Sequence, residues 1–435
     1  MAFVFTQGRE YISFEDVAPI FDVLRADLVP AEFRGKTSSQ REALWPAWVT
    51  GRDAAIRRRV AAGDEDSIVN FLLYGTSFTR RPRPTERQIA DLVERPSGAL
   101  AWLRPRIDDL VAGIAAPGAN ERLQFARDVL AKKGDPKAYL EQRTFEMTRS
   151  GALRTRALLD AGSTALSDRL TLFRERGLSS DTSIFIDYGI DATLEDMKAQ
   201  GALRAGAVHR VAIIGPGLDF TDKLDGYDFY PPQTIQPFAV IDSLMRLGLA
   251  PAAGVDVTAF DLSPRILAHL DAARMRAKAG RGYPVVVPRN LDQSWSMPLM
   301  HYWQRFGDRI GMKAAAPALP PNAGRAEVRS IVVRPSVVQS VTVKDLNVVL
   351  QHPDEGAFDL VIATNILLYY DVFEQSLASV NIARMLRPDG FLLTNDRIFE
   401  LPTTPLTGVG FTDVSYISLP GIGDTGTRII WYQRQ

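Results

Sequence analysis

Residues 208–220 read Val-His-Arg-Val-Ala-Ile-Ile-Gly-Pro-Gly-Leu-Asp-Phe, and this stretch decides the expected fold. The run Val211–Ile214 is short, continuous and apolar, which is typical of a strand buried on both faces. The strand pattern ends at Gly215-Pro216-Gly217, where glycine permits a sharp turn and a close approach of a ligand to the backbone. Ligands of open α/β sheets bind outside the carboxyl ends of strands, so Gly215 and Gly217 are candidates for the floor of a nucleotide-type pocket. An ordinary tight turn after a strand would give the same pattern.

A second β-rich run, Val255–Phe260, ends in an acid, Asp261. A carboxylate at the tip of the second strand can accept hydrogen bonds from both hydroxyls of a ribose. Ser263 and Pro264 follow, and they suit the N-cap and the first position of a helix. Asp261 therefore has an alternative role as a cap of that helix. The glycine turn upstream favours the ribose interpretation.

From residue 206 onward, strand and helix patterns alternate, which predicts a parallel sheet with helices on its faces. Further strands are expected over 331–343, 358–365, 391–395, 411–419 and 427–433. The last two of these flank a glycine-rich tip and are interpreted as a terminal hairpin. A long loop over 221–236 and an excursion at about 292–330, rich in aromatic residues and methionine, interrupt the alternation.

The N-terminal half has mainly helical spacing of its apolar residues. Within it, the run Arg57-Arg58-Arg59 is interpreted as a solvated helix edge, and 179–188 as a short β-like segment. The loop 75–85, with hydroxyl groups and three arginines, is either a surface loop or a contact for an acidic ligand. We expect a mainly helical domain over 1–200, as a substrate cap or partner-binding domain, and an α/β domain over 201–435 with the insertion at about 292–330.

Composition limits the partners. Lys plus Arg and Asp plus Glu are equal at 51 each, so no net charge steers the chain toward nucleic acid or an anionic membrane. Cysteine is absent and the four histidines lack metal-ligand spacing, so we expect no metal site. The first residues lack the pattern of a signal peptide, and no apolar run reaches the length of about 18 residues that a membrane span needs. We therefore expect a cytoplasmic protein without a nucleic-acid or membrane partner.

The predicted seven strands, the terminal hairpin and the residues at the strand ends resemble the class I S-adenosylmethionine-dependent methyltransferases, a Rossmann-like α/β fold, over roughly 206–435. Five stretches carry the resemblance, namely Ile213–Gly217, Phe260–Asp261, Asp345–Asn347, Phe358–Val361 and Arg387–Phe391. The most similar pattern within the superfamily is that of the CheR-type methyltransferases. Its Glu-Pro-Tyr-Ser-like segment resembles Gln236–Ala239, and its Arg-Asn-Val-Leu-Ile-Tyr-Phe segment resembles Thr364–Tyr370. The chain departs from these patterns at Ile213, Asp219, Gln236 and Thr364.

The resemblance implies S-adenosylmethionine as cofactor and methyl transfer to a small molecule or a protein side chain. Asn365 and Tyr369 are the candidate catalytic residues, because they follow the fourth strand where an acceptor would arrive. The implied cofactor-binding residues are Gly215, Pro216, Gly217, Asp219, Gln236, Asp261, Leu262, Asp345, Leu346 and Thr364. Two other functions stay open: an aminopropyl-type transferase, whose polyamine the acids of 219–228 would hold, and a catalytically inactive binding protein on the same fold.

Overall fold

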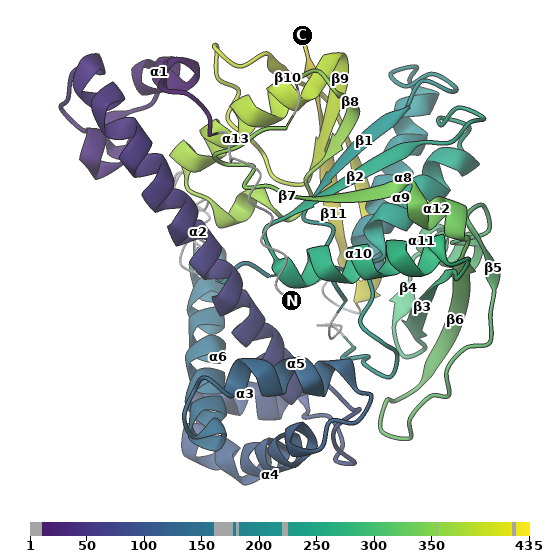
Figure 1. The fold of residues 1–435 in the computed structure, drawn as a ribbon. Helices are drawn as coiled ribbons and strands as arrows, with labels where there is room; N and C mark the ends of the chain where they lie inside the picture. The colour runs from purple at the N-terminus through teal and green to yellow at the C-terminus, as the bar shows by residue number, and fades with distance from the viewer. Residues whose placement is uncertain (1–10, 161–176, 180–181, 220–224, 354, 420–422) are drawn as a thin grey trace.

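The computed structural model describes residues 11–160, 177–179, 182–219, 225–353, 355–419 and 423–435 (Figure 1). Within these residues, the main sheet has eight strands in the order β4-β10-β11-β9-β8-β1-β2-β7. The neighbours from β7 to β9 pair in parallel, whereas β11, β10 and β4 each pair antiparallel with the preceding strand in that direction. The strands are β1 (Arg210–Ile214), β2 (Asp256–Asp261), β4 (Ser294–Trp295), β7 (Val341–Asp345), β8 (Phe358–Ile362), β9 (Leu386–Thr394), β10 (Leu406–Leu419) and β11 (Gly423–Arg434).

The direction of winding changes at β1. The chain continues from β1 to β2 and β7 on one side, and then returns to β8 and β9 on the other. In register, Ile213 of β1 lies between Ala259 of β2 and Ile362 of β8. The carboxyl ends of these three strands therefore meet at a topological switch point, the place where open α/β sheets bind ligands.

Two strand predictions need correction. The seven-stranded count is low by one, because Ser294 and Trp295 of the predicted insertion pair with β10 as the edge strand β4. The strand expected at 331–343 is divided into β6 (Ala326–Val333), the helix α12 (Pro335–Gln339) and β7, because Pro335 begins a helical turn. β6 belongs instead to a second sheet of three strands among the described residues, between β3 (Tyr283–Asn290) and β5 (Gly311–Lys313).

The β-like prediction for 179–188 is wrong. The structure has the helix α8 (Ile184–Ala199) here, and the Ser183 hydroxyl accepts from the Phe185 amide at its start. The run Ile-Phe-Ile at 184–186 favours a strand by local propensity, but α8 buries its apolar residues against α9 (Gln236–Arg246) and the sheet. Tertiary packing therefore overrides the local preference.

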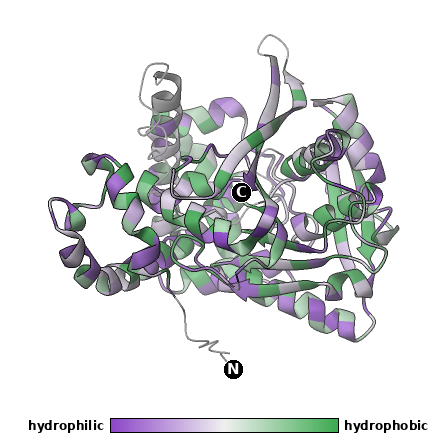
Figure 2. Cartoon of the chain, turned by 90° about the horizontal axis from the view of Figure 1, so that it is seen from above, coloured by the Kyte–Doolittle hydropathy of each residue, from purple (hydrophilic) through white to green (hydrophobic). Residues whose placement is uncertain are grey.

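The sheet separates two hydrophobic cores, and β1 contributes to both by strict alternation. Val211 and Ile213 face the core shared with α8, α9 and α10 (Pro264–Lys278). Ala212 and Ile214 face the core shared with α13 (Val372–Met385) and α1 (Phe14–Val23). Figure 2 shows that apolar and polar residues alternate along the helices and strands around these cores. The central strands are thus buried on both faces, as their continuous apolar runs predict.

The N-terminal helices form a third hydrophobic core away from the sheet (Figure 1). Its members are the last turns of α2 (Ser38–Tyr74) together with α3 (Glu86–Glu94), α4 (Pro96–Ala115), α5 (Glu121–Leu130) and α6 (Pro136–Asp160). The first turns of α2 instead contribute Trp45 and Val49 to the core under α13. One continuous helix therefore joins the helical bundle to the sheet. No helix of the described residues is both long and apolar enough to cross a membrane.

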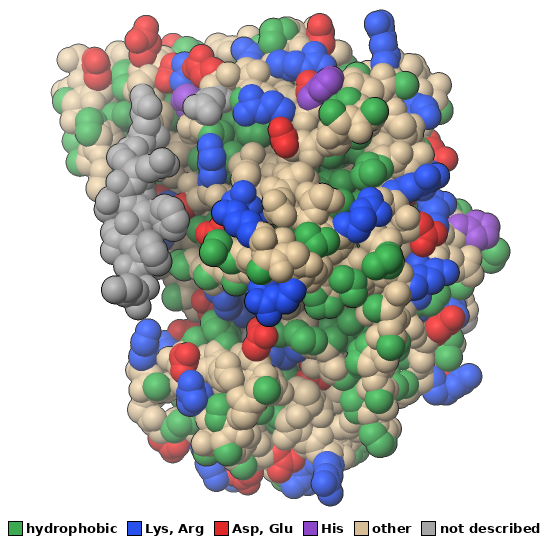
Figure 3. All heavy atoms as spheres, turned by 45° about the vertical axis from the view of Figure 1, so that its right-hand side comes forward, with side chains coloured by type: hydrophobic (Ala, Val, Ile, Leu, Met, Phe, Trp, Pro, Cys, Tyr) green, Lys and Arg blue, Asp and Glu red, His purple; other side chains and the backbone are tan. Residues whose placement is uncertain are grey.

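Arginines of α2 attach this helix to the α/β part of the chain. The Arg52 Nε donates to Glu374 of α13 at 2.5 Å, and the Arg59 Nη2 donates to the carbonyl of Tyr369 at 2.8 Å. Arg57 makes an ion pair with Asp345 at the end of β7, at 2.9 Å. The interpretation of Arg57-Arg58-Arg59 as a solvated edge is therefore wrong for two of its three members. Elsewhere, basic and acidic side chains are interspersed over the described part of the face in Figure 3.

Candidate functional site

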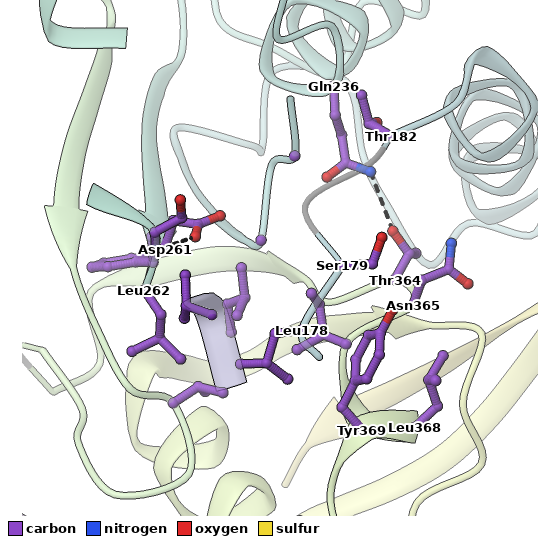
Figure 4. A pocket seen from close by; sticks show the side chains of 18 of the residues that line it. Leu178, Ser179, Thr182, Gln236, Asp261, Leu262, Thr364, Asn365, Leu368 and Tyr369 are labelled. Carbon is purple, nitrogen blue, oxygen red and sulfur yellow. Dashed lines mark hydrogen bonds between the residues drawn. The ribbon is translucent and has the colours of Figure 1, made fainter. Parts of the chain in front are cut away.

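A cavity of about 390 Å³ lies at the carboxyl ends of β1, β2 and β8, at the topological switch point (Figure 4). Four groups of residues line it: the tips of these strands with the loops that follow them, the residues after β7, the start of α9, and segments that precede the sheet in the chain. The described residues that line it are Val60, Asp64, Leu178, Ser179, Thr182, Ser183, Ile186, Ile214, Gly215, Gly217, Gln236, Phe260, Asp261, Leu262, Ser263, Leu346, Val348, Thr364, Asn365, Ile366, Leu368, Tyr369 and Tyr370.

The structure brings most of the predicted site residues together. Nine of them line this cavity, namely Gly215, Gly217, Gln236, Asp261, Leu262, Leu346, Thr364, Asn365 and Tyr369. Pro216, Asp219 and Asp345 are absent from the lining among the described residues. The separation of 44 residues between Gly217 and Asp261 in the sequence does not separate them in space, because the parallel pairing of β1 and β2 aligns their ends.

The glycine turn after β1 needs glycine for two reasons. Gly215 and Gly217 both have positive φ, 69° and 72°, a conformation that residues with a side chain rarely adopt. A Cβ atom on Gly215 would lie 2.2 Å from the Cδ1 atom of Ile366, which projects from the tip of β8. The Gly215 amide donates to the Phe260 carbonyl at 2.8 Å, which ties the turn to β2. The turn therefore presents bare backbone to the cavity.

Asp261 lies at the tip of β2, where its carboxylate lines the cavity (Figure 4). One oxygen, Oδ1, accepts a hydrogen bond from the Ser263 amide at 2.7 Å. Burial raises the pKa of this carboxyl to about 7, although the Ser263 and Leu262 amides and Arg265 act in the opposite direction. Asp261 thus accepts from the amide of Ser263, the residue that precedes α10, and it also borders the cavity, while its role toward a ribose stays a prediction.

Gln236 and Thr364 close the cavity from opposite sides of the switch point. Gln236 begins α9, and its Nε2 donates to the Thr364 Oγ1 at 3.2 Å (Figure 4). Both side chains are buried. The positions at which this chain departs from the CheR-type pattern therefore form a neutral hydrogen bond with each other.

The loop after β8 carries Asn365 and Tyr369, and it is organised by the tip of β9. The Asp396 Oδ2 accepts from the amides of Leu367 and Leu368, at 3.1 and 3.2 Å, and so caps the short helix η4 (Leu367–Tyr369). Burial raises the pKa of the Asp396 carboxyl to about 6, against the effect of these two amides. The predicted strand over 391–395 includes Asn395 but not Asp396, so this role of Asp396 was not predicted.

Two predicted cofactor ligands have other partners. Asp219 accepts from the Tyr230 hydroxyl at 2.8 Å and from the Gln233 Nε2 at 3.1 Å, and it is buried in the loop that precedes α9. Asp345 pairs with Arg57 through both carboxylate oxygens, at 2.9 and 3.1 Å. In the structure, Asp219 therefore orders its own loop and Asp345 attaches α2, while Leu346 beside it lines the cavity.

Sequence reasoning missed the walls that come from the N-terminal half. Leu178 and Ser179 line the cavity because their segment crosses α2 at Gly63, where a Cβ atom would lie 1.8 Å from the Leu178 carbonyl oxygen. Thr182 and Ser183 precede α8 and also line it. A signal for this wall existed in Ser183, which suits an N-cap, but the strand prediction for 179–188 hid it.

Comparisons with known proteins gave structural neighbours only. No family model and no curated protein matches the chain. A TehB-like SAM-dependent methyltransferase from Corynebacterium glutamicum is 13% identical, with a TM-score of 0.26, over 65% of this chain and 96% of that chain. The N-methyltransferase NodS from Bradyrhizobium japonicum, solved with S-adenosyl-L-homocysteine, is 14% identical, with a TM-score of 0.27, over 56% and 85%.

A third neighbour is the magnesium protoporphyrin IX methyltransferase from Synechocystis, also solved with bound S-adenosyl-L-homocysteine, at 12% identity and a TM-score of 0.26 over 66% and 95%. With TM-scores of this size, we draw no functional conclusion from the similarity. Among the described residues, no group of three or more His, Asp or Glu side chains is arranged to hold a metal ion.

Proposed function

We propose that the protein is an S-adenosylmethionine-dependent methyltransferase. One observation carries the proposal: a single cavity at the topological switch point is bordered by the bare backbone of Gly215 and Gly217, the carboxylate of Asp261, and the polar tip of β8 at Asn365. A nucleoside needs a hydrogen-bond acceptor for its ribose hydroxyls, which the Asp261 carboxylate supplies. It also needs a close approach to the backbone for the rest of the molecule, which Gly215 and Gly217 permit.

The chemical types of the lining residues match the parts of this cofactor. Asp261 would accept from the ribose hydroxyls, and the apolar side chains of Phe260, Leu262 and Leu346 would flank the adenine. The glycine turn would take the amino-acid portion, with the polar groups of Gln236 beside it. When bound, the sulfonium supplies a methyl group that is already activated, so the protein need only align an acceptor and exclude water.

The acceptor would enter beside the tip of β8. Asn365, Tyr369, Leu178 and Ser179 all border the cavity (Figure 4). We propose that the N-terminal half, 1–200, closes the cavity and selects the acceptor, because α2 contributes Val60 and Asp64 to the same wall. Small molecules and protein side chains both satisfy this description.

Calorimetric titration of the full chain with S-adenosylmethionine and with S-adenosyl-L-homocysteine tests the proposal. We expect micromolar binding of both and competition between them. Incubation with methyl-labelled S-adenosylmethionine and candidate acceptors then separates a working enzyme from an inactive binding protein. If neither ligand binds to the folded protein, the proposed function is wrong.

The aminopropyl-transferase alternative has no specific support in the structure. It requires free acids in the loop after the glycine turn, but the described acids there are used internally. Asp228 accepts from the Thr76 and Ser77 amides at 2.9 Å each, and Asp225 accepts from the Asn290 and Gln293 side chains. Asp219 is likewise bonded. We therefore propose methyl transfer alone.

A further inference from the structure

Asn365, at the acceptor end of the cavity, has an unusual backbone conformation. Its φ is 58°, in the left-handed region, where residues other than glycine are uncommon and asparagine is tolerated best. Its side chain is exposed and lines the cavity. Glycine would adopt this backbone conformation without a steric cost. The presence of asparagine therefore suggests that its side chain has a role at this position.

Asn395, at the tip of β9, holds Asn365 through two hydrogen bonds. The backbone N–H of Asn365 donates to the side-chain Oδ1 of Asn395 at 2.7 Å. The side-chain Nδ2 of Asn395 donates in turn to the side-chain Oδ1 of Asn365 at 2.6 Å. A backbone N–H can only donate, so the atom of Asn395 that faces it must be the oxygen. The other atom of Asn395 is then the NH2 group, and the atom of Asn365 that faces it must also be an oxygen.

The positions of the oxygen and nitrogen atoms in the Asn365 side-chain amide are therefore fixed by the backbone N–H of Asn365, which sets the orientation of Asn395. Its carbonyl oxygen is engaged by Asn395, and its NH2 group has no hydrogen-bond acceptor among the described residues. Neither N–H bond is thus used within the described residues, and Asn365 lies at the edge of the cavity next to Thr364 (Figure 4). The acceptor end presents a hydrogen-bond donor of defined polarity.

We propose that the Asn365 NH2 group binds a carbonyl or carboxylate oxygen of the methyl acceptor, and that Asn395 is the positioning residue that gives Asn365 this polarity. The inference rests on the proposed function and specifies the class of its substrate. A hydrogen bond to the attacking lone pair itself would compete with methyl transfer. The donor therefore suits an oxygen beside the attacking atom, or the second oxygen of a carboxylate.

An inversion of this polarity tests the proposal. In Asn395→Asp, one carboxylate oxygen still accepts from the Asn365 backbone, and the other replaces the NH2 group. The Asn365 side chain must then turn its own NH2 group toward Asp, which leaves its carbonyl oxygen at the cavity. The shape of the site is unchanged, but a donor becomes an acceptor. Asn120→Asp, at the start of α5 and outside the cavity lining, controls for the added charge, since either residue type suits an N-cap.

Two uncharged probes of nearly equal shape are suitable: acetophenone, which carries a carbonyl oxygen, and α-methylstyrene, which has a CH2 group in its place. Their affinities are measured by ligand-observed NMR with the protein saturated with S-adenosyl-L-homocysteine. In the wild-type protein and in Asn120→Asp, we expect acetophenone to bind about 2- to 12-fold more tightly, the value of one net hydrogen bond. In Asn395→Asp, we expect this preference to be lost or reversed, while the Kd for S-adenosyl-L-homocysteine stays within twofold.

The outcomes separate this inference from the proposed function. If S-adenosyl-L-homocysteine does not bind the wild-type protein, the proposed function fails and takes the inference with it. If it binds but the two probes bind equally, or neither binds, only the inference is overturned. A preference for acetophenone that persists in a folded Asn395→Asp protein also overturns it, because a purely structural role for Asn395 would leave the preference unchanged.

Discussion

Replacement of Asp261 by asparagine should weaken the binding of S-adenosyl-L-homocysteine without unfolding the protein. One carboxylate oxygen is committed to the Ser263 amide at 2.7 Å, and the asparagine carbonyl can keep this bond. The NH2 group then replaces the second oxygen, so a ribose hydroxyl meets a donor where it needs an acceptor. Hydrogen bonds to charged groups contribute about 1.5–3 kcal/mol, which corresponds to roughly a 10- to 150-fold increase in Kd.

The pH dependence of this effect provides a second, independent measurement. Because burial raises the pKa of Asp261 to about 7, the carboxylate of the ligand-free protein loses its charge as the pH falls below neutrality. A ligand that prefers the charged form should bind more weakly below pH 7, by up to about tenfold per pH unit. The Asp261→Asn variant has no carboxyl at this position, so its Kd should change much less between pH 6 and pH 8.

Isothermal titration at pH 6, 7 and 8 gives both quantities, with circular dichroism as the control for folding. The ratio of Kd values between variant and wild type should be largest at pH 8. A ratio that stays within twofold at every pH, for a folded variant, would refute the assignment of Asp261 to the ribose. A wild-type affinity that does not change with pH would refute the role of its charge.

Gly217→Val should raise the Kd for S-adenosyl-L-homocysteine by more than about 100-fold in calorimetry, because φ is 72° and the backbone faces the cavity; near-normal affinity would contradict the tail assignment. Gly63→Ala should lower both stability in urea and ligand affinity, because its Cβ would lie 1.8 Å from the Leu178 carbonyl that leads into the cavity wall; Gly51→Ala, also inside α2 but with open space around its Cβ, is the matched control and should leave ligand affinity unchanged and raise stability slightly. Since the folded pKa of Asp396 is raised to about 6, the folded state binds this proton more tightly, so the stability from this group is present below about pH 4 and is lost as the pH rises through 6. Asp396→Asn should therefore flatten the fall of Tm between pH 4 and pH 7, and an unchanged slope would count against the shift.

The sheet and the strand ends were predictable because their signals are local. The apolar runs of β1, β2 and β8 each end in a distinct turn or polar residue, and parallel strands bring their carboxyl ends together without further information. Gly217, Asp261 and Asn365 are far apart in the sequence, yet each could be located from its own strand. The start of α8 was mistaken for a strand because β-branched residues occupy a position where burial, not propensity, decides.

The remaining parts of the site depend on contacts between distant segments. Asn395 and Asp396 orient the loop after β8 from about 30 residues away, and an Asn-Asp pair after a strand has no pattern that specifies this role. Arg57 and Asp345 are 288 residues apart, so the sequence gives no sign of their ion pair. Without this partner, the arginine run has the pattern of a solvated helix edge. Such partners become visible only when the fold has placed them.

Helix α2 passes the cavity at Val60 and Asp64, about two thirds along its length, with its first turns under α13 and its last turns in the separate helical bundle. From Ser38 to Asp64 it runs about 39 Å, at a rise of about 1.5 Å per residue. If the helix tilted by about 5° about its first turns, Asp64 would move sideways by roughly 3 Å, the size of a water molecule. A partner bound to the helical bundle that tilts α2 would therefore displace the part of the cavity wall that carries Asp64.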